Sequence, residues 1–444
     1  MGCSKNRVDS EHLMVKIAGS GIVILPEDAA LPTQEGVANG TEERVDAVII
    51  NTCGFIKDAK VESINVILDA VDAKERGLIG HVFVFGCLSQ RYMDELVAEI
   101  PEVDGFFGAF DTASILEVMN VMDDKSLNTK RYLTTPKHYA YLKISEGCDR
   151  TCSYCSIPLI RGKHISVPME ELVEEAQNLS AQGVKELIVI AQDTTYYGLD
   201  LYGKRMLAPL LEKLCAIEGI EWIRIHYSYP AQFPQDVLDV MASNPKICKY
   251  LDIPLQHAST KVLQAMRRSI DGPKTQQIID DIRSKVPGVV LRTTMIVGHP
   301  GEDRREFEKL LNFVQKNRVE RLGAFTYSEE EGTFGAANFK DTIRESTKQT
   351  RYEELMELQS EISYTYNHSR IGSVERVIID SFSDGVFVAR SQYESPEVDG
   401  EILIGKESML EKFGENFVPQ SLIGEFVQVK ITGANEYDLI AEFI

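Results

Sequence analysis

The residues with the clearest chemical potential are three cysteines in one short run, Cys148, Cys152 and Cys155, spaced C-x3-C-x2-C. Thiolates this close together can hold three corners of a cubane iron–sulfur cluster. No fourth cysteine is near them in the sequence, so one iron would keep an open coordination position, as catalytic zinc does. Structural zinc is the alternative, but it normally takes four ligands as two separated pairs, and the second pair is missing. The run therefore favours a cluster.

A second set of cysteines, Cys3, Cys53 and Cys87, is dispersed along the chain. Cys53 follows a predicted strand, Val45–Asn51, and Cys87 follows another, His81–Gly86. Neighbouring parallel strands bring their carboxyl ends to one edge of the sheet, so we expect these two thiols to converge. Inert burial is the alternative, because free cysteines are often buried. The shared strand-end position favours a second three-cysteine cluster.

Two further features support this grouping. Cys3 precedes a predicted helix, Asp9–Ala18, which could bring it to the same edge. Each of the three cysteines also has a glycine neighbour, which would let the backbone approach a bulky ligand closely: Gly2, Gly54 and Gly86. The remaining cysteines, Cys215 on a predicted helix and Cys248 before a predicted strand, have no ligand partners in the sequence and are expected to be inert.

The elements that must position these cysteines fall into three zones. The first zone, 1–120, alternates buried strands with helices predicted at Lys57–Arg76 and Arg91–Glu99, which is typical of a parallel sheet covered on both faces. Within it, Pro26–Gly40 is predicted to be a loop. Pro101–Lys137 reads as a connection, and we place a linker at 121–137.

The second zone, 138–369, repeats a strand followed by a helix. Six such units predict an open or partial (β/α)6 barrel, with its chemistry at the carboxyl ends of the strands. The predicted strands are Ala140–Ser145, Glu186–Ile190, Trp222–His226, Tyr250–Ile253, Val289–Val297 and Leu322–Tyr327. The predicted helices are Pro168–Gln182, Ala208–Ile217, Pro234–Ala242, Thr260–Arg268, Asp303–Lys316 and Lys348–Asn367.

The third zone, 370–444, switches to short alternating segments separated by turns. This pattern predicts a small all-β barrel. Its predicted strands are Ser373–Ile379, Gly385–Arg390, Glu401–Ile404 and Glu425–Ile431.

Composition limits the class of protein. The chain has 444 residues, enough for about three domains, and 43% of them are hydrophobic, as in globular proteins. No segment reaches the ~18 apolar residues of a membrane helix, and none at the start resembles a secretion signal. Eight cysteines then indicate a reducing compartment, so we expect a cytoplasmic protein that is not associated with a membrane.

The net charge of −21 disfavours general nucleic-acid binding and favours basic partners.

The C-x3-C-x2-C run at the start of a βα barrel resembles the radical S-adenosylmethionine (SAM) superfamily. With a three-cysteine zone before it and a β zone after it, the whole chain is similar to the methylthiotransferases of that superfamily. The resemblance implies an α/β fold class: a flavodoxin-like N-terminal parallel sheet, a partial TIM-like radical SAM barrel, and a C-terminal TRAM barrel. Family members usually have a short strand before the first cysteine. Only two residues precede Cys3, so the first sheet is expected to lack a strand.

Two branches of this family matter. One modifies an adenosine in tRNA (MiaB-type), and the other modifies an aspartate of ribosomal small-subunit protein S-twelve (RimO-type). The chain resembles the aspartate-modifying branch in these stretches: Gly2-Cys3-Ser4-Lys5-Asn6 with Val8-Asp9-Ser10-Glu11, Glu146-Gly147-Cys148-Asp149-Arg150, Ile157-Pro158 with Arg161-Gly162-Lys163, and Asp252-Ile253-Pro254-Leu255-Gln256-His257.

The resemblance also implies an activity and its cofactors. A hydrogen on a carbon without acidity cannot be removed by a His or Glu base, so a radical is needed. The resemblance implies two [4Fe–4S] clusters, one on each set of three cysteines. The C-x3-C-x2-C cluster would reduce SAM to a radical that takes a hydrogen from the aspartate β-carbon, and the dispersed set would carry the sulfur. A second SAM would supply the methyl group, and an external electron donor is implied. Burial within the barrel would protect the radical.

Four residues are expected to contact SAM, and no catalytic residue is predicted beyond the cluster ligands. Tyr154, between the cluster cysteines, could lie against the adenosine. Gln192 and Asp193 end a predicted strand and could bind polar groups of SAM. Thr294 belongs to the run Arg292–Gly298, which ends another predicted strand and could line the adenine. Ordinary aromatic packing and turn formation are the alternatives.

The charge of the third zone helps to choose the substrate. It carries 6 Lys/Arg against 14 Asp/Glu, a formal charge of −8. Such a surface repels RNA and attracts a basic ribosomal protein, although a merely solvated acidic face is the alternative. We therefore expect an S-twelve aspartate methylthiotransferase that acts on free or ribosome-bound S-twelve and not on tRNA. A tRNA adenosine methylthiotransferase and a non-enzymatic iron–sulfur carrier are the alternatives.

Overall fold

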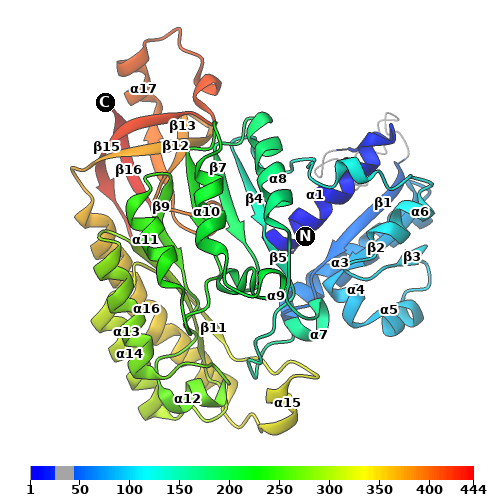
Figure 1. Cartoon of the computed structure of the whole chain (residues 1–444), viewed down its shortest axis with the longest axis horizontal. Helices are drawn as coiled ribbons and strands as arrows, with labels where there is room; N and C mark the ends of the chain where they lie inside the picture. Colours follow the sequence, from blue (N-terminus) through cyan, green and yellow to red (C-terminus); the bar gives the residue numbers. More distant parts are fainter. Residues whose placement is uncertain (1, 26–44) are drawn as a thin grey trace.

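The computed structural model describes residues 2–25 and 45–444, so the loop predicted at Pro26–Gly40 lies outside the described residues. Figure 1 shows an N-terminal lobe, a central lobe with a large sheet, and a C-terminal barrel on the opposite side of the central lobe. The expected fold class is confirmed, because parallel sheets form the first two lobes and a closed five-stranded barrel forms the third. None of the helices in the described residues is both long enough and apolar enough to traverse a lipid bilayer.

The N-terminal lobe contains a parallel sheet with the strand order β1-β2-β3. β1 and β2 pair from Val45↔Ile79 to Thr52↔Gly86, so the two strands end side by side. Apolar residues from the sheet and the long helix that crosses it form one core. The elements are α1 (Ser4–Gly19), β1 (Val45–Thr52), α3 (Lys57–Glu75), β2 (Ile79–Gly86), α4 (Cys87–Arg91), α5 (Met93–Glu99), β3 (Gly105–Phe106) and α6 (Thr112–Val118).

Three sequence predictions for this lobe need correction. The first helix starts at Ser4 and not near Asp9, because polar residues of the first turn hid its start from a search for apolar periodicity. The helix expected at Arg91–Glu99 begins at Met93 as α5, because Tyr92, whose φ and ψ of −129° and 36° are not helical, separates it from α4, which ends at Arg91. The connection expected after residue 101 contains β3 and α6, and a two-residue strand is too short to give a pattern.

The central lobe contains six parallel strands in the order β11-β10-β9-β8-β7-β4. Its strands β4, β7, β8 and β9 are nearly continuous buried runs, as a sheet covered on both faces requires, and every residue of β7 is buried. The first elements are η2 (Lys125–Leu127), β4 (Tyr139–Lys143), β5 (Ser145–Glu146), α7 (Ile157–Arg161), β6 (Ile165–Ser166), α8 (Met169–Ala181), β7 (Glu186–Ile190), η3 (Thr194–Tyr196), α9 (Leu199–Tyr202) and α10 (Leu207–Cys215). The others are β8 (Trp222–Ile225), α11 (Gln235–Ser243), β9 (Ile247–Asp252), α12 (Thr260–Ala265), α13 (Gly272–Lys285), β10 (Val290–Val297), α14 (Arg304–Asn317), β11 (Arg321–Thr326), α15 (Phe334–Asn338) and α16 (Glu345–Ser369).

The C-terminal barrel closes in the order β12-β13-β14-β16-β15. The sequence did not predict β16, although it alternates buried and exposed residues and closes the barrel by pairing with both β14 and β15. Closure leaves no free sheet edge in this barrel. Its elements are β12 (Val374–Ser383), β13 (Val386–Ser391), β14 (Ile402–Gly405), α17 (Lys406–Phe413), η4 (Pro419–Leu422), β15 (Phe426–Ala434) and β16 (Leu439–Phe443).

A buried carboxylate, Glu394, joins the barrel to the central lobe. It accepts a hydrogen bond from the Ser391 hydroxyl at 2.6 Å, and it pairs with Arg321 of β11 at 3.1 Å and with Arg370. Burial would raise the pKa of Glu394, but the guanidinium groups of Arg370 and Arg321 outweigh it and lower the pKa to about 2. The ionised carboxylate therefore stabilises this junction.

Glu394→Gln is expected to lower the free energy of unfolding at pH 7 by about 3 kcal/mol, because a carboxyl pKa of about 2 in the folded protein lies below the ordinary 4.5. This contribution is complete above about pH 4.5 and is lost as the pH falls towards 2. Urea unfolding at pH 7 and about pH 3, with the exposed Glu415→Gln as control, measures the effect. An equal deficit at both pH values would contradict a role for the ionised carboxylate.

Candidate metal centres and the polar link between them

The cysteines of the C-x3-C-x2-C run lie on the loop between β5 and α7, beyond the carboxyl end of β4. The backbone N–H of Cys155 donates to the carbonyl of Cys152 at 3.2 Å, and the N–H of Arg150 donates to Cys148 Sγ at 3.4 Å. The loop enters through Gly147, whose φ is +72° and whose added Cβ would lie 2.0 Å from the Lys163 carbonyl oxygen. Only glycine fits there, so the loop conformation requires it.

The donor set of this loop suits an iron–sulfur cluster. Burial raises the pKa of Cys148 to about 12 and raises the pKa of Cys155 above its usual range, so a metal would have to displace protons to bind. Arg268 approaches Cys152 Sγ at 3.8 Å, and such contacts with ligand sulfurs tune the potential of a cluster. Soft thiol donors with cationic neighbours fit this cofactor.

The structure also brings the dispersed cysteines together. The pairing of Thr52 with Gly86 places Cys53 and Cys87 at adjacent strand ends. The contact is close, because a Cβ on Gly54 would lie 2.7 Å from the Cys87 carbonyl oxygen. Burial raises the pKa values of the Cys53 and Cys87 thiols, and each is also raised by the charge of Cys3 nearby.

Asn6 connects the third cysteine to this group. The thiols of Cys3 and Cys87 both donate to Asn6 Oδ1 at 3.6 Å. The Asn6 amide is held in turn by the Thr52 carbonyl at 2.9 Å and by Asn51 Oδ1 at 3.1 Å. Three thiols from α1 and the ends of β1 and β2 therefore face one region, although Cys3 is exposed.

Both sets are suited to a cluster and not to one ion. Within residues 2–25 and 45–444, no three His, Cys, Asp or Glu side chains meet closely enough to hold a single metal ion. A cubane is larger, and its three protein ligands bind three different irons. Cys215 and Cys248 are buried on α10 and β9 and belong to neither set.

One guanidinium links the two sets of cysteines. Arg161, at the end of the helix that follows the C-x3-C-x2-C loop, donates to Cys87 Sγ at 3.3 Å and to Asn6 Oδ1 at 2.7 Å. It also pairs with Asp9 at 2.8 Å and with Glu146 at 3.2 Å. Lys143 of β4 pairs with the same two carboxylates. The N-terminal and central lobes thus meet through a partly buried ionic network.

Two of the four residues expected to contact SAM, Gln192 and Asp193, follow the carboxyl end of β7, whereas Tyr154 lies on the C-x3-C-x2-C loop. The Tyr154 hydroxyl is 3.4 Å from Arg268, and the Gln192 amide donates to Glu146 at 2.7 Å. Asp193 pairs with Arg150 at 2.8 Å and caps η3, so these contacts already account for its carboxylate. Thr294 lies on β10 and is partly buried. Their contact with SAM stays a prediction.

Several buried polar atoms at this face have no hydrogen-bond partner among the described residues, and a bound ligand with polar groups would satisfy them. SAM has a carboxylate, an ammonium, ribose hydroxyls and an adenine, so it offers both donors and acceptors. The unpartnered atoms are Gln192 Oε1, Gln256 Oε1, Arg150 Nη2, Arg268 Nε and the Tyr327 hydroxyl oxygen.

Sequence reasoning missed the polar residues that surround the cysteines. Asn6, Glu146 and Arg161 stand within six residues of a cysteine along the chain, so proximity to the C-x3-C-x2-C run or to Cys3 was an available signal. Arg268, which approaches Cys152, carried no such signal because it lies more than a hundred residues further on. Only the folded chain brings it to the cluster loop.

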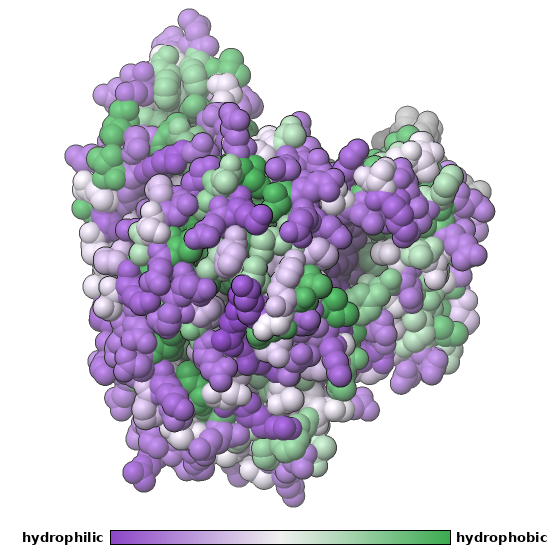
Figure 2. Space-filling view, viewed as in Figure 1, coloured by the Kyte–Doolittle hydropathy of each residue, from purple (hydrophilic) through white to green (hydrophobic). Residues whose placement is uncertain are grey.

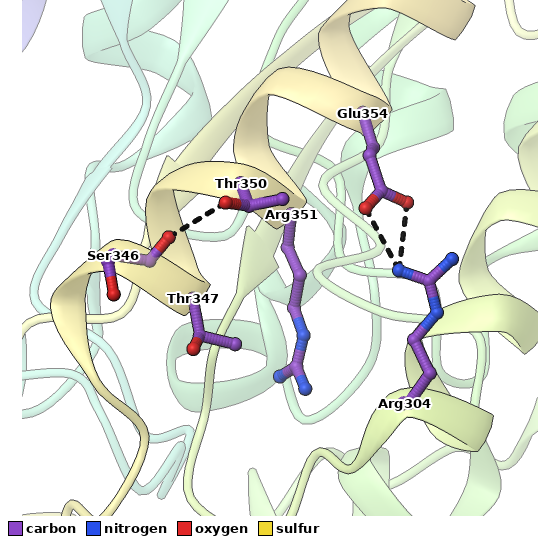
Figure 3. A pocket seen from close by; sticks show the side chains of 6 residues that line it. All are labelled: Arg304, Ser346, Thr347, Thr350, Arg351 and Glu354. Carbon is purple, nitrogen blue, oxygen red and sulfur yellow. Dashed lines mark hydrogen bonds and ion pairs between the residues drawn. The ribbon is translucent and has the colours of Figure 1, made fainter.

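A hollow of about 310 Å³ lies between α14 and α16 (Figure 3). Its charges are neutralised within the protein, because Arg304 pairs with Glu354 at 2.9 Å and Arg351 pairs with Glu302 at 2.7 Å. None of the six clustered cysteines lines it, so we assign the chemistry to the cysteine sites and not to this hollow.

Comparison with known families gives matches in all three lobes. The radical SAM superfamily matches residues 142–314, the TRAM domain matches residues 371–444, and Uncharacterized protein family UPF0004 matches residues 1–108. Among solved structures, the radical SAM methyltransferase TsrM from Kitasatospora setae aligns with a TM-score of 0.52 at 12% identity, covering 73% of this chain and 70% of that one. The cobalamin-dependent radical enzyme OxsB aligns with a TM-score of 0.51 at 10% identity, covering 80% and 53%. At such identities these likenesses show the fold.

Sequence relatives are much closer. A protein from Cytophaga hutchinsonii called ribosomal protein uS12 methylthiotransferase RimO is 48% identical over 444 residues, which is 100% of this chain and 96% of the relative. A protein of the same name from Porphyromonas gingivalis is 49% identical over 100% of this chain and 98% of the relative.

The parallel central sheet and the three-cysteine loop beyond the carboxyl ends of its strands define a radical SAM enzyme, whose cofactors are SAM and [4Fe–4S] clusters. The N-terminal lobe and the TRAM barrel narrow the class further. The chain belongs to the family of ribosomal protein uS12 methylthiotransferases.

Proposed function

We propose that this protein adds a methylthio group to the β-carbon of an aspartate in ribosomal small-subunit protein S-twelve. The observation that carries the proposal is the close similarity, 48% identity over the full chain, to proteins named for this activity. The two groups of three cysteines also support the proposal, because the reaction needs one centre that generates a radical and another that supplies sulfur. The chain would work in the cytoplasm with an external electron donor and without tRNA.

The six clustered cysteines are the ligands of the proposed centres. Cys148, Cys152 and Cys155 would hold one [4Fe–4S] cluster, and the set of Cys3, Cys53 and Cys87 would hold the other. When bound, the clusters supply the electron that cleaves SAM and the sulfur that is inserted. Tyr154, Gln192, Asp193 and Thr294 are proposed to hold SAM at the strand ends. We place the functional units at 1–120, 138–369 and 370–444, with a linker at 121–137.

The residues between the two centres position them. Arg161 donates to Cys87, to Asn6 and to two carboxylates, so it fixes the distance between the lobes. Its side chain is only 2% exposed, and those of Asp9 and Glu146 are 12% and 16% exposed, so little water reaches this contact. A dry and rigid surrounding is what radical chemistry needs, because water and mobile side chains quench radicals.

Acidic residues at the edge of the barrel support a basic protein substrate. A cleft of about 600 Å³ lies between the barrel and the start of β4, and five carboxylates line it: Asp380, Glu397, Asp399, Glu401 and Asp438. Burial and the charges of Asp438 and Asp380 raise the pKa of Glu401. Two of the other carboxylates are paired within the protein, Asp380 with Arg390 and Glu397 with Arg7. Such a surface attracts a basic ribosomal protein and repels the phosphates of tRNA.

The proposed function is tested by offering both substrates. Anaerobically reconstituted enzyme with SAM, a reductant and sulfide is expected to increase the mass of S-twelve by one methylthio group and to leave tRNA unchanged. Mass spectrometry of S-twelve and nucleoside analysis of tRNA from the same reactions provide the measurement. Modified tRNA together with unmodified S-twelve would overturn the proposal, and no SAM cleavage at all would favour an iron–sulfur carrier.

A further inference from the structure

Lys5 is an ammonium group at the meeting point of the two lobes. It lies in the first turn of α1, two residues after Cys3, and α1 packs against β4 of the central lobe (Figure 1). Its Nζ stands 3.4 Å from the centroid of the Tyr227 ring, just beyond the carboxyl end of β8. Figure 2 shows that the molecular surface is hollowed between the N-terminal and central lobes.

The cations around Lys5 already have carboxylate partners. Lys143 and Arg161 share Asp9 and Glu146. Among the residues that the structure describes, Lys5 has no carboxylate within ion-pair distance. The face of Tyr227 is its one close polar contact there, and such a contact is weaker than a carboxylate in a partly buried place. Lys5 is therefore available to an anion from outside the chain.

The support beneath Lys5 is rigid and strained. Tyr227 has a φ of +57°, in the left-handed region that side chains with a Cβ rarely adopt. Its backbone N–H donates to Asp252 at 2.9 Å, and its carbonyl accepts from the N–H of Thr194 at 3.2 Å. Backbone strain of this kind persists where surrounding contacts enforce it, commonly at functional sites. The backbone that carries the ring beneath the ammonium is therefore held in one place.

We infer that the Lys5 ammonium binds the side-chain carboxylate of the target aspartate. The inference rests on the proposed function. The hydrogen to be removed lies on the carbon next to that carboxylate, so a cation that holds the carboxylate also places the β-carbon. Since Lys5 follows Cys3 by two residues and faces the barrel strand ends, the carbon would lie between the proposed sulfur source and the SAM site. The same contact distinguishes aspartate from asparagine, which has no charge to pair with Lys5.

The test is a double-mutant cycle on binding. Wild-type and Lys5→Met holoenzymes are each titrated with S-twelve and with S-twelve in which the target aspartate is replaced by asparagine. Wild-type enzyme is expected to bind the aspartate form about 10- to 100-fold more tightly, as a hydrogen bond between charged groups requires. Lys5→Met should bind the two forms equally, and Lys5→Arg should recover part of the preference. A purely structural role for Lys5 would weaken both forms alike and leave their ratio unchanged, which would overturn the inference.

Lys213→Met serves as the control for the loss of one positive charge. This substitution removes the charge from an exposed position on α10 and should leave the preference intact. Iron and sulfide contents show whether each variant carries its clusters, and thermal unfolding shows whether it is folded. If Lys5→Met lacks clusters or does not fold, Lys5→Arg is used for the test instead.

Weaker SAM binding by Lys5→Met with an unchanged preference for aspartate over asparagine would place Lys5 at SAM and contradict the inference. If wild-type enzyme modifies S-twelve but shows no preference, the inference fails while the proposed function stands; if it does not modify S-twelve, the proposed function itself fails.

Discussion

Replacing Cys152 with alanine is expected to lower the formation of 5′-deoxyadenosine from SAM by more than about 100-fold. Loss of a residue that only supports a metal ligand typically costs 10- to 100-fold, and the loss of a ligand should cost more. Cys152 is the middle member of the loop trio, and its carbonyl also accepts from the N–H of Cys155. Quantifying 5′-deoxyadenosine and methionine in anaerobic reactions measures the effect.

The matched control is Cys215→Ala. Cys215 is a buried cysteine, but it lies on α10 and belongs to neither trio, so this variant should retain full cleavage. Iron analysis gives a second readout: about eight irons per chain in the wild type and in the control, and about four in Cys152→Ala, because each cubane holds four. Unchanged iron with normal cleavage in Cys152→Ala would show that the loop is not the SAM-cleaving centre.

The central sheet could be predicted from the sequence because its strands are buried on both faces. β7 was predicted with its observed limits, Glu186–Ile190, since five buried residues give one uninterrupted run between polar turns. The convergence of Cys53 and Cys87 was predictable for a related reason, because parallel strands end at one edge. The position of Cys3 was harder to predict, because it depends on where α1 starts, and the predicted helix began five residues too late.

The polar residues of the site were less accessible to sequence reasoning. Arg161 was visible only as part of a family stretch, and its contact with Cys87, 74 positions earlier, arises from the packing of two lobes. Asp193 was predicted from its strand-end position to bind SAM, but that position also places it to pair with Arg150 and cap η3. Strand ends collect polar side chains for turns and for ligands alike, so position alone cannot separate the two roles.

Replacing Cys53 with alanine is expected to separate the two halves of the reaction. Cys53 belongs to the dispersed trio, at the end of β1, and the C-x3-C-x2-C loop does not depend on it for any backbone contact. SAM cleavage should therefore remain within about twofold of the wild type, whereas methylthiolated S-twelve should fall by more than about 100-fold. Parallel assays of 5′-deoxyadenosine and of S-twelve mass measure the two outcomes in one reaction.

Cys248→Ala, which removes a buried cysteine from β9, is the control for this separation and should leave both outcomes unchanged. The comparison distinguishes two roles for the N-terminal lobe. If the lobe only seals the barrel, Cys53→Ala should leave product formation intact. If the substitution opens the contact between the N-terminal lobe and Arg161, it should reduce SAM cleavage and product formation together. If the dispersed trio is the source of sulfur, cleavage continues while no sulfur is inserted. Full product from Cys53→Ala would refute a sulfur-supplying role for the trio, because a cubane site that has lost one of three protein ligands would then be carrying out the reaction unimpaired.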